Sequence, residues 1–353
     1  MKSLLPIKPK LPTNTKIAVI VLVLASLFLP SPFVILSPGN PQNILGSAIT
    51  ITGAESYPTT GKLSVTSVMV TDPDSYITGF DVLYGWFDKN RAVLPRVEVY
   101  PKGESAADSK KSGAEEMSSS QTNATAAALS FLGYKTSSNL VITEVNEKTN
   151  AYKLLLKSDI VITVDDKKFL SASEIMRYLD QKQPGDLVSI KVLRSGGEII
   201  TKQIKLSARD DGSAFIGVNI QQNFDFPFEV KIQLAETGGP SGGLIFALGV
   251  VEKLTQADLI RGRNIAGTGT ITADGQVGPI GGIAEKIIGA KKDGVKIFLA
   301  PIENCTDIKN KDQLTNSGSK NDMKIVPVAT LTEAISVLNL PADTTYPSCA
   351  TAS

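Results

Sequence analysis

A long uncharged stretch of apolar residues is the first feature of the chain. It runs from Ile17 to Leu36, and its length of about 20 residues would span about 30 Å as a helix, the thickness of a bilayer's hydrocarbon core. The pattern predicts a transmembrane helix over residues 17–36. A cleaved signal peptide is the alternative, since residues 17–29 resemble an apolar signal core. However, Pro30-Ser31-Pro32-Phe33 offers no small-x-small cleavage site.

The lysines around this stretch predict its orientation. Residues 1–16 form a basic tail without acidic residues, and no Lys or Arg follows the apolar stretch until Lys62. Positive charge favours the cytoplasmic side of a membrane. We therefore expect a single-pass protein of the cytoplasmic membrane, with its N-terminus inside and everything after about Ser37 outside.

Apolar and polar residues alternate after this anchor. The β-branched run from Leu63 to Val70 is typical, and it predicts strands between residues 37 and 100. Residues 103–125 are rich in Ser, Ala, Lys and Glu and have little apolar periodicity, which indicates a polar linker or a solvated helix. Residues 37–125 are therefore expected to form an extracytoplasmic β-rich region and linker.

A compact alternation of short strands with one helix follows. The capping-box spacing of Ser171 and Glu174 marks the start of the helix, and Pro184-Gly185 and Ser195-Gly196-Gly197 mark turns. The expected elements are strands at 140–145, 160–164, 187–193 and 198–206 and a helix at 174–181. This pattern predicts a small β domain over residues 126–208.

The C-terminal part combines apolar helices with a buried strand. The run Leu244–Leu254 predicts a strongly apolar helix, and residues 283–292 predict a second helix that ends before Asp293-Gly294. A buried strand is expected at 295–299. We expect an α/β domain at 225–340, followed by a C-terminal tail at 341–353.

Composition narrows the chemistry. The 353 residues include 36 basic and 35 acidic side chains, and this net charge of +1 argues against a nucleic-acid-binding protein. Histidine is absent, which excludes a Ser-His-Asp triad, a Cys-His dyad and an HExxH zinc helix. Nucleophilic catalysis would need another base, and lysine is the leading candidate. Cys305 and Cys349 are too few for a four-thiolate zinc site, so no metal ion or cofactor is expected.

A serine between glycines stands at the start of the first apolar helix. Gly238-Gly239-Pro240-Ser241-Gly242-Gly243 precedes Leu244 directly. Unpaired N–H groups and the positive end of the helix dipole meet at a helix N-terminus, where they can stabilise an oxyanion. We expect Gly239, Pro240 and Gly242 to form this backbone site. An ordinary serine N-cap is the alternative. The nucleophile elbow of α/β-hydrolases is excluded because it needs a histidine.

Lys286 is the candidate base. It lies on the expected helix 283–292, beside an apolar face that contains Ile283, Ile287 and Ala290. A lysine at the rim of such a face often only extends to water. Desolvation, however, disfavours the charged amine and lowers its pKa, so a buried Lys286 could accept the proton of a serine hydroxyl. Activity that rises with pH is then expected.

Four motifs occur in one order along the C-terminal part. They are Gly-Pro-Ser-Gly-Gly at 239–243, Thr-Gly-x-Ile-Thr at 268–272, Gly-Gly-Ile-Ala-Glu-Lys at 281–286 and Ala-Pro-x-Glu-Asn at 300–304. Together they resemble the proteolytic domain of Lon-type proteases over about residues 225–338. The resemblance implies Ser241 as the nucleophile, Lys286 as the general base and Thr268 as the residue that hydrogen-bonds the lysine. Gly238 is a departure, because many members have an acid there.

The preceding β domain resembles a PDZ domain of bacterial envelope proteases. Phe131-Leu132-Gly133-Tyr134 stands where such domains receive a peptide carboxylate, and Leu156–Ile160 stands where they usually read Leu-Lys-x-Gly-Asp, with Ser158 in place of Gly. The resemblance implies peptide binding by strand addition, with Phe131, Leu132, Gly133 and Tyr134 in the binding loop. A spacer domain without a ligand is the alternative.

The whole layout resembles the membrane-anchored, PDZ-containing Lon-like serine proteases of bacterial envelopes. The expected fold is α+β and multidomain, with a transmembrane helix, a β-rich region, a PDZ-like domain and a Lon-type domain. The implied function is a serine endopeptidase that cleaves unfolded or exposed protein segments outside the membrane. The sequence has no Walker A motif, so no nucleotide is expected to be needed. The resemblance also suggests a homo-oligomer, as a hexamer.

Two other functions fit the same residues. One is a catalytically silent, peptide-binding scaffold protein of the envelope, which Gly238 and the altered PDZ turn favour. The other is a Ser-Lys amidase that acts on non-peptide amides. Cys305 and Cys349 would lie outside the membrane, where a disulfide can form, and two free thiols are the alternative.

Overall fold

The computed structural model divides the chain into two units. It describes residues 12–169, 171–209, 211–234, 238–309, 323–341 and 344–349. The main unit comprises Met1–Ala128 and Val230–Ser353, and the inserted unit comprises Leu129–Glu229. The inserted unit therefore interrupts the main unit in the sequence, and each is described by itself below.

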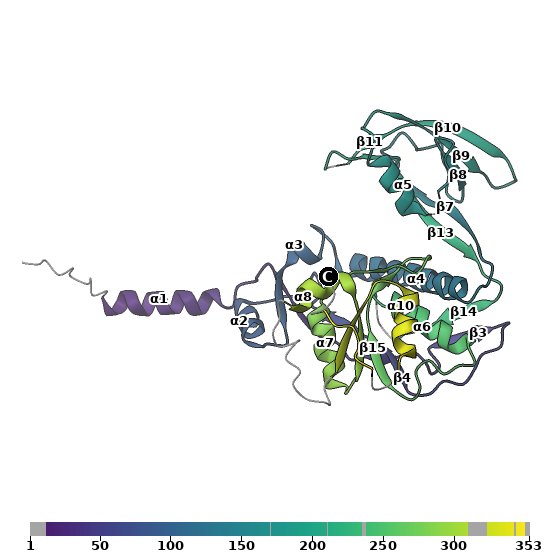
Figure 1. Cartoon of the computed structure of the whole chain (residues 1–353). Helices are drawn as coiled ribbons and strands as arrows, with labels where there is room; N and C mark the ends of the chain where they lie inside the picture. Colours follow the sequence, from purple (N-terminus) through teal and green to yellow (C-terminus); the bar gives the residue numbers. More distant parts are fainter. Residues whose placement is uncertain are drawn as a thin grey trace, which may run out of the picture. The chain divides into compact units, whose positions relative to one another are not determined.

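Four parallel strands form the centre of the main unit (Figure 1). They are β4 (Lys62–Val65), β15 (Asn264–Gly267), β18 (Ile297–Pro301) and β19 (Lys324–Val328). The short antiparallel strand β2 (Gln42–Asn43) completes the sheet in the order β19-β18-β15-β4-β2. Because the four strands are parallel, their carboxyl ends meet at one edge of the sheet.

Helices cover both faces of this sheet. Ala266 and Phe298 belong to a buried cluster with Ile287 of α7 (Ile283–Lys292). Gly267, the next residue of β15, lies instead against Ile245 of α6 (Gly243–Leu254). Successive strand residues point to opposite faces, so α7 and α6 pack on opposite sides of the sheet. Helix α10 (Leu331–Asn339) packs beside α6.

A second sheet of the main unit has the order β5-β1-β6. Strand β1 (Phe33–Pro38) lies in its middle and pairs in antiparallel fashion with β5 (Val68–Val70) and β6 (Ala92–Pro95). Helix α7 contacts β1. The remaining elements of this unit are α1 (Thr13–Ser26), β3 (Ile49–Thr52), α2 (Gly79–Phe87), α3 (Arg96–Val99), α4 (Ala106–Phe131), β14 (Glu229–Ile232), β16 (Thr270–Ile271), β17 (Val277–Gly278), η1 (Ile302–Asn304) and α8 (Cys305–Lys309).

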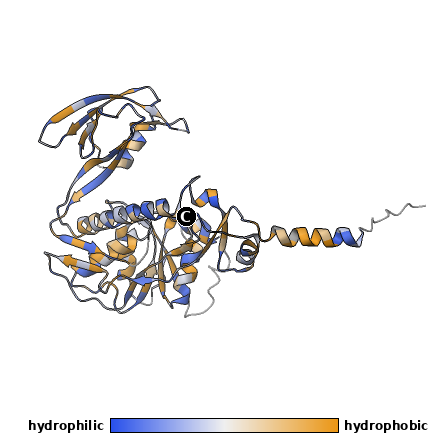
Figure 2. Ribbon diagram, turned by 180° about the vertical axis from the view of Figure 1, so that it is seen from behind, coloured by the Kyte–Doolittle hydropathy of each residue, from blue (hydrophilic) through white to orange (hydrophobic). Residues whose placement is uncertain are grey.

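The prediction of a transmembrane helix at 17–36, and with it of a single-pass membrane protein, is wrong. Helix α1 has 14 residues and ends at Ser26, and none of the helices formed by the described residues is long and apolar enough to cross a membrane. Figure 2 shows that α1 is nevertheless apolar over much of its length. The basic tail at 1–16 lies mostly outside the described residues.

The second half of the apolar stretch forms a buried strand instead. Val34, Ile35 and Leu36 of β1 are only 2%, 6% and 7% exposed. Pro30 and Pro32 separate this strand from α1, and proline in a helix interior removes a hydrogen bond and clashes with the preceding turn. The apolar run therefore reads as one continuous span, although its two halves belong to different elements.

Residues 37–125 are also part of the main unit rather than a separate β-rich region. Strands β2 and β4 join the central sheet, where Leu63 pairs with Ile265. All but the first three residues of the segment 103–125 belong to the 26-residue helix α4 (Ala106–Phe131), which Figure 2 shows as mostly polar. Its N-terminal turns are mainly exposed, whereas Ala124 and Ala126–Leu129 are buried.

The inserted unit is built around a five-stranded antiparallel sheet of order β10-β9-β8-β7-β13. Its elements are β7 (Ser137–Val145), β8 (Ile160–Val164), α5 (Ala172–Leu179), β9 (Leu187–Leu193), β10 (Ile199–Lys205), β11 (Ser207–Ala208), β12 (Ala214–Phe215) and β13 (Val218–Asp225). The Ser171 hydroxyl caps α5 by accepting from the Glu174 N–H, as the sequence predicts. Helix α5 contacts β12 and β13, and β13 lies at an edge of the sheet.

Candidate active site

The candidate nucleophile lies on the loop that leads into α6. Gly242 is the N-cap residue of this helix, and no side chain caps it, so the Ser241 hydroxyl is not an ordinary helix cap. Gly239 has a φ of +87°, a left-handed conformation that favours glycine. A Cβ on Gly243 would lie 2.8 Å from the Ile271 side chain. The glycines therefore allow both the turn and the close packing of α6.

The candidate base reaches this serine from the other face of the sheet. Lys286 Nζ donates to Ser241 Oγ at 2.7 Å and to Thr268 Oγ1 at 3.0 Å. Ser241 precedes α6, Lys286 lies in the first turn of α7, and Thr268 directly follows β15. The three side chains therefore meet at the carboxyl edge of the central sheet, between the two helices that cover its faces.

The hydroxyl of Thr268 restricts how Lys286 can bond. Thr268 Oγ1 donates to the Ser241 carbonyl at 2.9 Å, and that carbonyl also accepts from the Gly269 N–H at 2.8 Å. Because the single hydroxyl hydrogen is used there, Thr268 must accept from Lys286 Nζ. A neutral amine that donates one N–H to Thr268 keeps its lone pair, and Ser241 is the other neighbour to which that lone pair can turn.

Burial favours the neutral form of Lys286. Its side chain is 3% exposed, and desolvation lowers the pKa of its ammonium group from 10.5 to about 7. Among the described residues, Lys286 takes part in no ion pair. An amine with a pKa near 7 is partly unprotonated at neutral pH, and it can therefore accept the proton of a serine hydroxyl.

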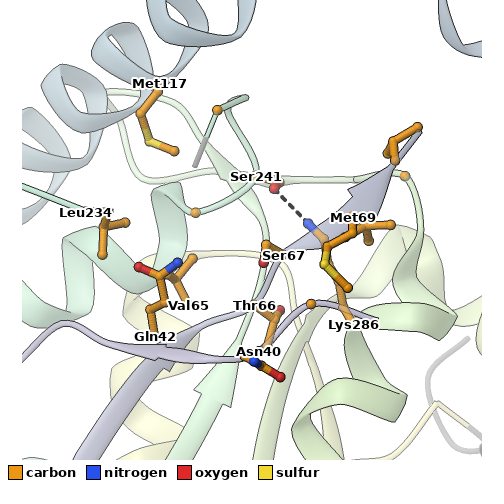
Figure 3. A pocket seen from close by; sticks show the side chains of 16 residues that line it. Asn40, Gln42, Val65, Thr66, Ser67, Met69, Met117, Leu234, Ser241 and Lys286 are labelled. Atoms are coloured by element: carbon orange, nitrogen blue, oxygen red, sulfur yellow. Dashed lines mark hydrogen bonds between the residues drawn. The ribbon is translucent and has the colours of Figure 1, made fainter. Parts of the chain in front are cut away.

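A cavity of about 740 Å³ opens beside Ser241 and Lys286 (Figure 3). Much of its lining is apolar, and it comes from segments that are far apart in the sequence. Thr66 and Met69 belong to the segment that leads from β4 into β5, whereas Met117 belongs to α4. Strand β5 is an edge strand of its sheet. The lining residues are Gly39, Asn40, Gln42, Val65–Val70, Met117, Leu234, Gly238, Ser241, Gly242, Gly281 and Lys286.

Of the three residues expected to form the backbone oxyanion site, Gly239, Pro240 and Gly242, two have no N–H group available. The Gly239 N–H donates to the Gly113 carbonyl of α4 at 2.8 Å, and proline has no N–H. These two residues therefore provide no donor for an oxyanion, and Gly242 remains from the expected set. Gly113 and Met117 were not recognised in the sequence, because the polar composition of 103–125 gave no sign of a helix beside the candidate site.

The expected peptide-binding loop of the inserted unit, Phe131–Tyr134, does not lead into an edge strand. Phe131 ends α4, and Tyr134 packs edge-on against Phe228 with ring centres 5.1 Å apart. The strand that follows, β7, is paired on both sides, with β8 and with β13. Strand addition needs an unpaired edge. The edge strand that lies beside helix α5 is β13, which follows the segment Ala214–Gly217.

Cys305 and Cys349 form a disulfide with a Cα–Cα distance of 5.1 Å. Both residues belong to the buried cluster that contains Ile283, Ala284 and Ile287 of α7. The disulfide therefore fastens the C-terminal segment beside the helix that carries Lys286. Among the described residues, no group of three or more Cys, Asp or Glu side chains is arranged to hold a metal ion.

Two protein-family models match parts of the chain. Residues 220–340 match the Lon protease (S16) C-terminal proteolytic domain, and residues 118–206 match the PDZ domain. The chain joins a PDZ domain to a Lon-type serine peptidase domain. The candidate residues Ser241, Thr268 and Lys286 all fall within the Lon-type match, whereas Met69, Gly113 and Met117 lie outside it.

Individual relatives agree with this assignment. The Lon protease of Azorhizobium caulinodans is 37% identical over 166 residues, which cover 43% of this chain and 19% of that protein. The Lon protease of Rhizobium meliloti is 36% identical over 105 residues, which cover 29% and 12%. Lon protease 1 of Bacillus subtilis is 30% identical over 149 residues, which cover 38% and 19%. The chain thus spans less than a third of these relatives' length.

The comparison with solved structures found PDZ domains. The PDZ domain of the SdrC-like protein of Listeria monocytogenes is 27% identical, with a TM-score of 0.22, and the match covers 23% of this chain and 85% of that one. The corresponding domain of Listeria innocua is 29% identical, with a TM-score of 0.22 and coverages of 23% and 92%.

Proposed function

We propose that this protein is a serine endopeptidase in which Ser241 is the nucleophile and Lys286 the general base. The observation that carries the proposal is the 2.7 Å contact between a buried amine and a serine hydroxyl beside a cavity. The Lon-type family match over 220–340 supports the reaction class. Its proposed substrates are unfolded or exposed protein segments, because a peptide must be extended for its backbone to reach Ser241 in the cavity.

The first half of the reaction is acyl transfer. Neutral Lys286 takes the Ser241 hydroxyl proton while Oγ forms a bond to the carbonyl carbon of the substrate peptide, which gives a tetrahedral oxyanion. The N–H groups of Ser241 and Gly242, at the N-terminus of α6, stabilise this charge. When the carbon–nitrogen bond breaks, the Lys286 ammonium gives its proton to the leaving amine, and an acyl ester remains on Ser241.

The second half hydrolyses the ester. Lys286, neutral again, takes a proton from water as the water oxygen bonds to the acyl carbon. The intermediate collapses by breaking its bond to Ser241 Oγ, which regains the proton from Lys286, and the new carboxylic acid leaves. Thr268 holds the amine in place in both halves by accepting one of its N–H groups.

We further propose that peptide cleavage needs no nucleotide. The printed sequence contains no Walker A motif, and Ser241 and Lys286 complete the proton transfers by themselves. An unfolded protein is expected to be cleaved at the same rate with ATP and magnesium, with a non-hydrolysable ATP analogue and magnesium, and without any nucleotide. Stimulation by ATP would contradict this part of the proposal.

The PDZ domain is proposed to bind extended peptide segments at the edge of β13, next to α5. The position of β13 at the edge of its sheet and its contact with α5 support this choice over the loop Phe131–Tyr134. A peptide that adds to this edge would use backbone hydrogen bonds for affinity and alternate side chains for specificity.

The peptidase proposal is tested on the full chain with fluorescein-labelled casein as the unfolded substrate. The Ser241→Ala and Lys286→Met variants are expected to lose at least 1,000-fold in rate, since each removes one partner of the proton transfer. Lys292→Met is the matched control, because Lys292 is an exposed lysine at the end of the same helix. Cleavage that survives in Ser241→Ala, or a wild-type chain that binds casein without cutting it, would overturn the proposal. The second result would favour a peptide-binding scaffold.

A further inference from the structure

Helix α4 contacts the loop that carries Ser241 at two points. The Gly113 carbonyl accepts from the Gly239 N–H at 2.8 Å, and the Ser120 hydroxyl donates to the Pro240 carbonyl at 2.9 Å. The two backbones lie close together, because a Cβ on Gly238 would come within 3.3 Å of Gly113. Both α4 residues are outside the Lon-type match at 220–340. The matched domain therefore does not by itself contain everything that holds this loop.

These two hydrogen bonds hold residues 238–241 in one conformation, although the glycines of this segment would allow several. Gly238 and Gly239 lack side chains and can rotate into conformations that other residues avoid. The peptide group between Pro240 and Ser241 could then turn with little steric resistance from the preceding residues. One bond on the Gly239 side and one on the Pro240 side remove this freedom.

The direction of the Pro240 carbonyl determines the direction of the Ser241 N–H. A peptide group is planar and trans, so its C=O and N–H point to opposite sides. Because Ser120 holds the Pro240 oxygen towards α4, the Ser241 N–H points to the side of the loop away from α4. An oxyanion that forms on the carbon bonded to Ser241 Oγ needs this N–H in a fixed direction, since oxyanion donors act through their preorganisation.

Ser120 differs from the serines beside it. Its side chain is 3% exposed, whereas Ser118 and Ser119 are exposed. A buried hydroxyl is costly unless it is hydrogen-bonded, and its described acceptor is the Pro240 carbonyl. Ser120 also lies next to the start of α6, because a Cβ on Gly243 would come within 3.1 Å of its hydroxyl oxygen.

We propose that Ser120 is a positioning residue for the peptidase reaction. Its hydroxyl holds the Pro240–Ser241 peptide group so that the Ser241 N–H faces the oxyanion, while Gly113 holds the preceding peptide group. Helix α4 is thus a functional part of the active site, although it lies outside the peptidase domain of the family. This inference rests on the proposed peptidase function.

The test compares full-length Ser120→Ala with the wild type and with Ser119→Ala, an exposed serine on the same helix. With labelled casein as substrate, we expect kcat of Ser120→Ala to fall about 10- to 100-fold, because part of one oxyanion donor is lost. KM is expected to stay within about twofold, because ground-state contacts are unchanged. The control is expected to match the wild type, and the thermal midpoints of all three are expected to agree within a few degrees.

Two further measurements separate positioning from general loosening. A peptidyl boronic acid forms a tetrahedral adduct with the serine, and Ser120→Ala is expected to weaken its affinity by about the same factor as kcat. The pH at half-maximal rate is expected to stay near that of the wild type, since Lys286 keeps its surroundings. Unchanged kcat and boronate affinity, or a loss that comes with a large fall in thermal midpoint, would overturn the inference. In the first case the peptidase proposal would stand, whereas a wild type that does not cleave would remove both.

Discussion

Lys286 combines properties that are rarely compatible in one side chain. It is charged in water, yet it is almost completely buried here beside Ser241 and Thr268. Burial makes the ammonium form unfavourable and lowers the pKa of the amine to about 7. The same desolvation that gives the protein a base at neutral pH therefore opposes the stability of the fold.

The rate of peptide cleavage is expected to follow the neutral fraction of Lys286. With a pKa near 7, the amine is mostly charged at pH 6, so kcat/KM should be about tenfold lower there than on the plateau above pH 8. The measurement is kcat/KM for labelled casein in overlapping buffers from pH 5.5 to 9. A rate that is independent of pH across this range, or that falls as pH rises, would contradict a lysine base.

Lys286→Met is expected to be inactive but more stable than the wild type at low pH. Between about pH 7 and 10.5, the unfolded chain holds the lysine proton while the folded chain does not, so wild-type stability rises with pH across this window. Below pH 7 the desolvation penalty approaches its full value, with about 5 kcal/mol as an upper figure. Urea unfolding at pH 6 and pH 9 should show a stability gain for the variant that is larger at pH 6. A less stable variant at pH 6 would show that the buried amine stabilises the fold.

At the scale of elements, α7 is fixed at its N-terminal side by the segment that follows β18. The Asn304 amide accepts from the Ile280 N–H and donates to the Ile280 carbonyl, both at 3.0 Å. Cys305 comes next in the chain, and its disulfide to Cys349 packs against α7. The position of Lys286 thus depends on a side-chain amide and on a covalent link.

Removing the disulfide is expected to destabilise the main unit. The bridge joins residues 44 positions apart, and a loop of this size corresponds to about 4 kcal/mol in the chain-entropy account. The double variant Cys305→Ser with Cys349→Ser should unfold at lower urea concentration than the oxidised wild type. A reductant should lower the urea midpoint of the wild type towards that of the double variant. It should leave the midpoint of the double variant unchanged. Equal midpoints for the oxidised wild type and the variant would contradict this expectation.

The sequence predicted some elements well because their signals are local. The apolar run after Ser241 corresponds to α6, and Gly282 and Asp293 flank α7 where the sequence suggested a helix. The motif spacing also singled out Ser241, Thr268 and Lys286, which the structure brings together. These features depend on short-range patterns, which a single sequence contains.

Other elements could not be predicted, because their environment comes from distant segments. The run 17–36 looks uniform in hydropathy, but pairing with β5 and β6 turns its second half into strand β1. Helix α4 shows little apolar periodicity over 103–125, and its contacts with Gly239 and Pro240 are made through a backbone carbonyl and one serine. Contacts between residues that are far apart in the sequence leave no trace in local composition.

At the scale of the whole chain, the PDZ domain is an insertion whose ends are neighbours. Ser137 of β7 pairs with Asp225 of β13, at the two points where the chain passes to and from the sheet of this unit. The lining of the cavity beside Ser241 comes entirely from the main unit. Binding of long substrates and cleavage of short ones should therefore be separable.

Replacing residues 138–224 by Asn-Gly should leave a folded peptidase. Asn-Gly is the favoured two-residue connection between antiparallel strands, and Ser137 and Asp225 already stand opposite each other. We expect the shortened chain to cleave a short fluorogenic peptide with a kcat/KM within about threefold of the wild type. Its KM for casein is expected to be higher than that of the wild type. A shortened chain that keeps a cooperative thermal transition but does not cleave the short peptide would show that the PDZ domain acts in the chemistry itself.

The parallel pairing of β4 with β15 has a consequence for any fragment that begins at the family boundary. Starting the chain at residue 220 deletes β2, β4 and the whole of α4, and the loss of β4 exposes the hydrogen-bonding edge of β15 from Asn264 to Gly267. An open edge of this kind invites other chains to add their own strands. The isolated peptidase domain would then associate with itself in solution. A separate peptide of residues 58–71, which contains β4, should cover the open edge of β15 and reduce this association.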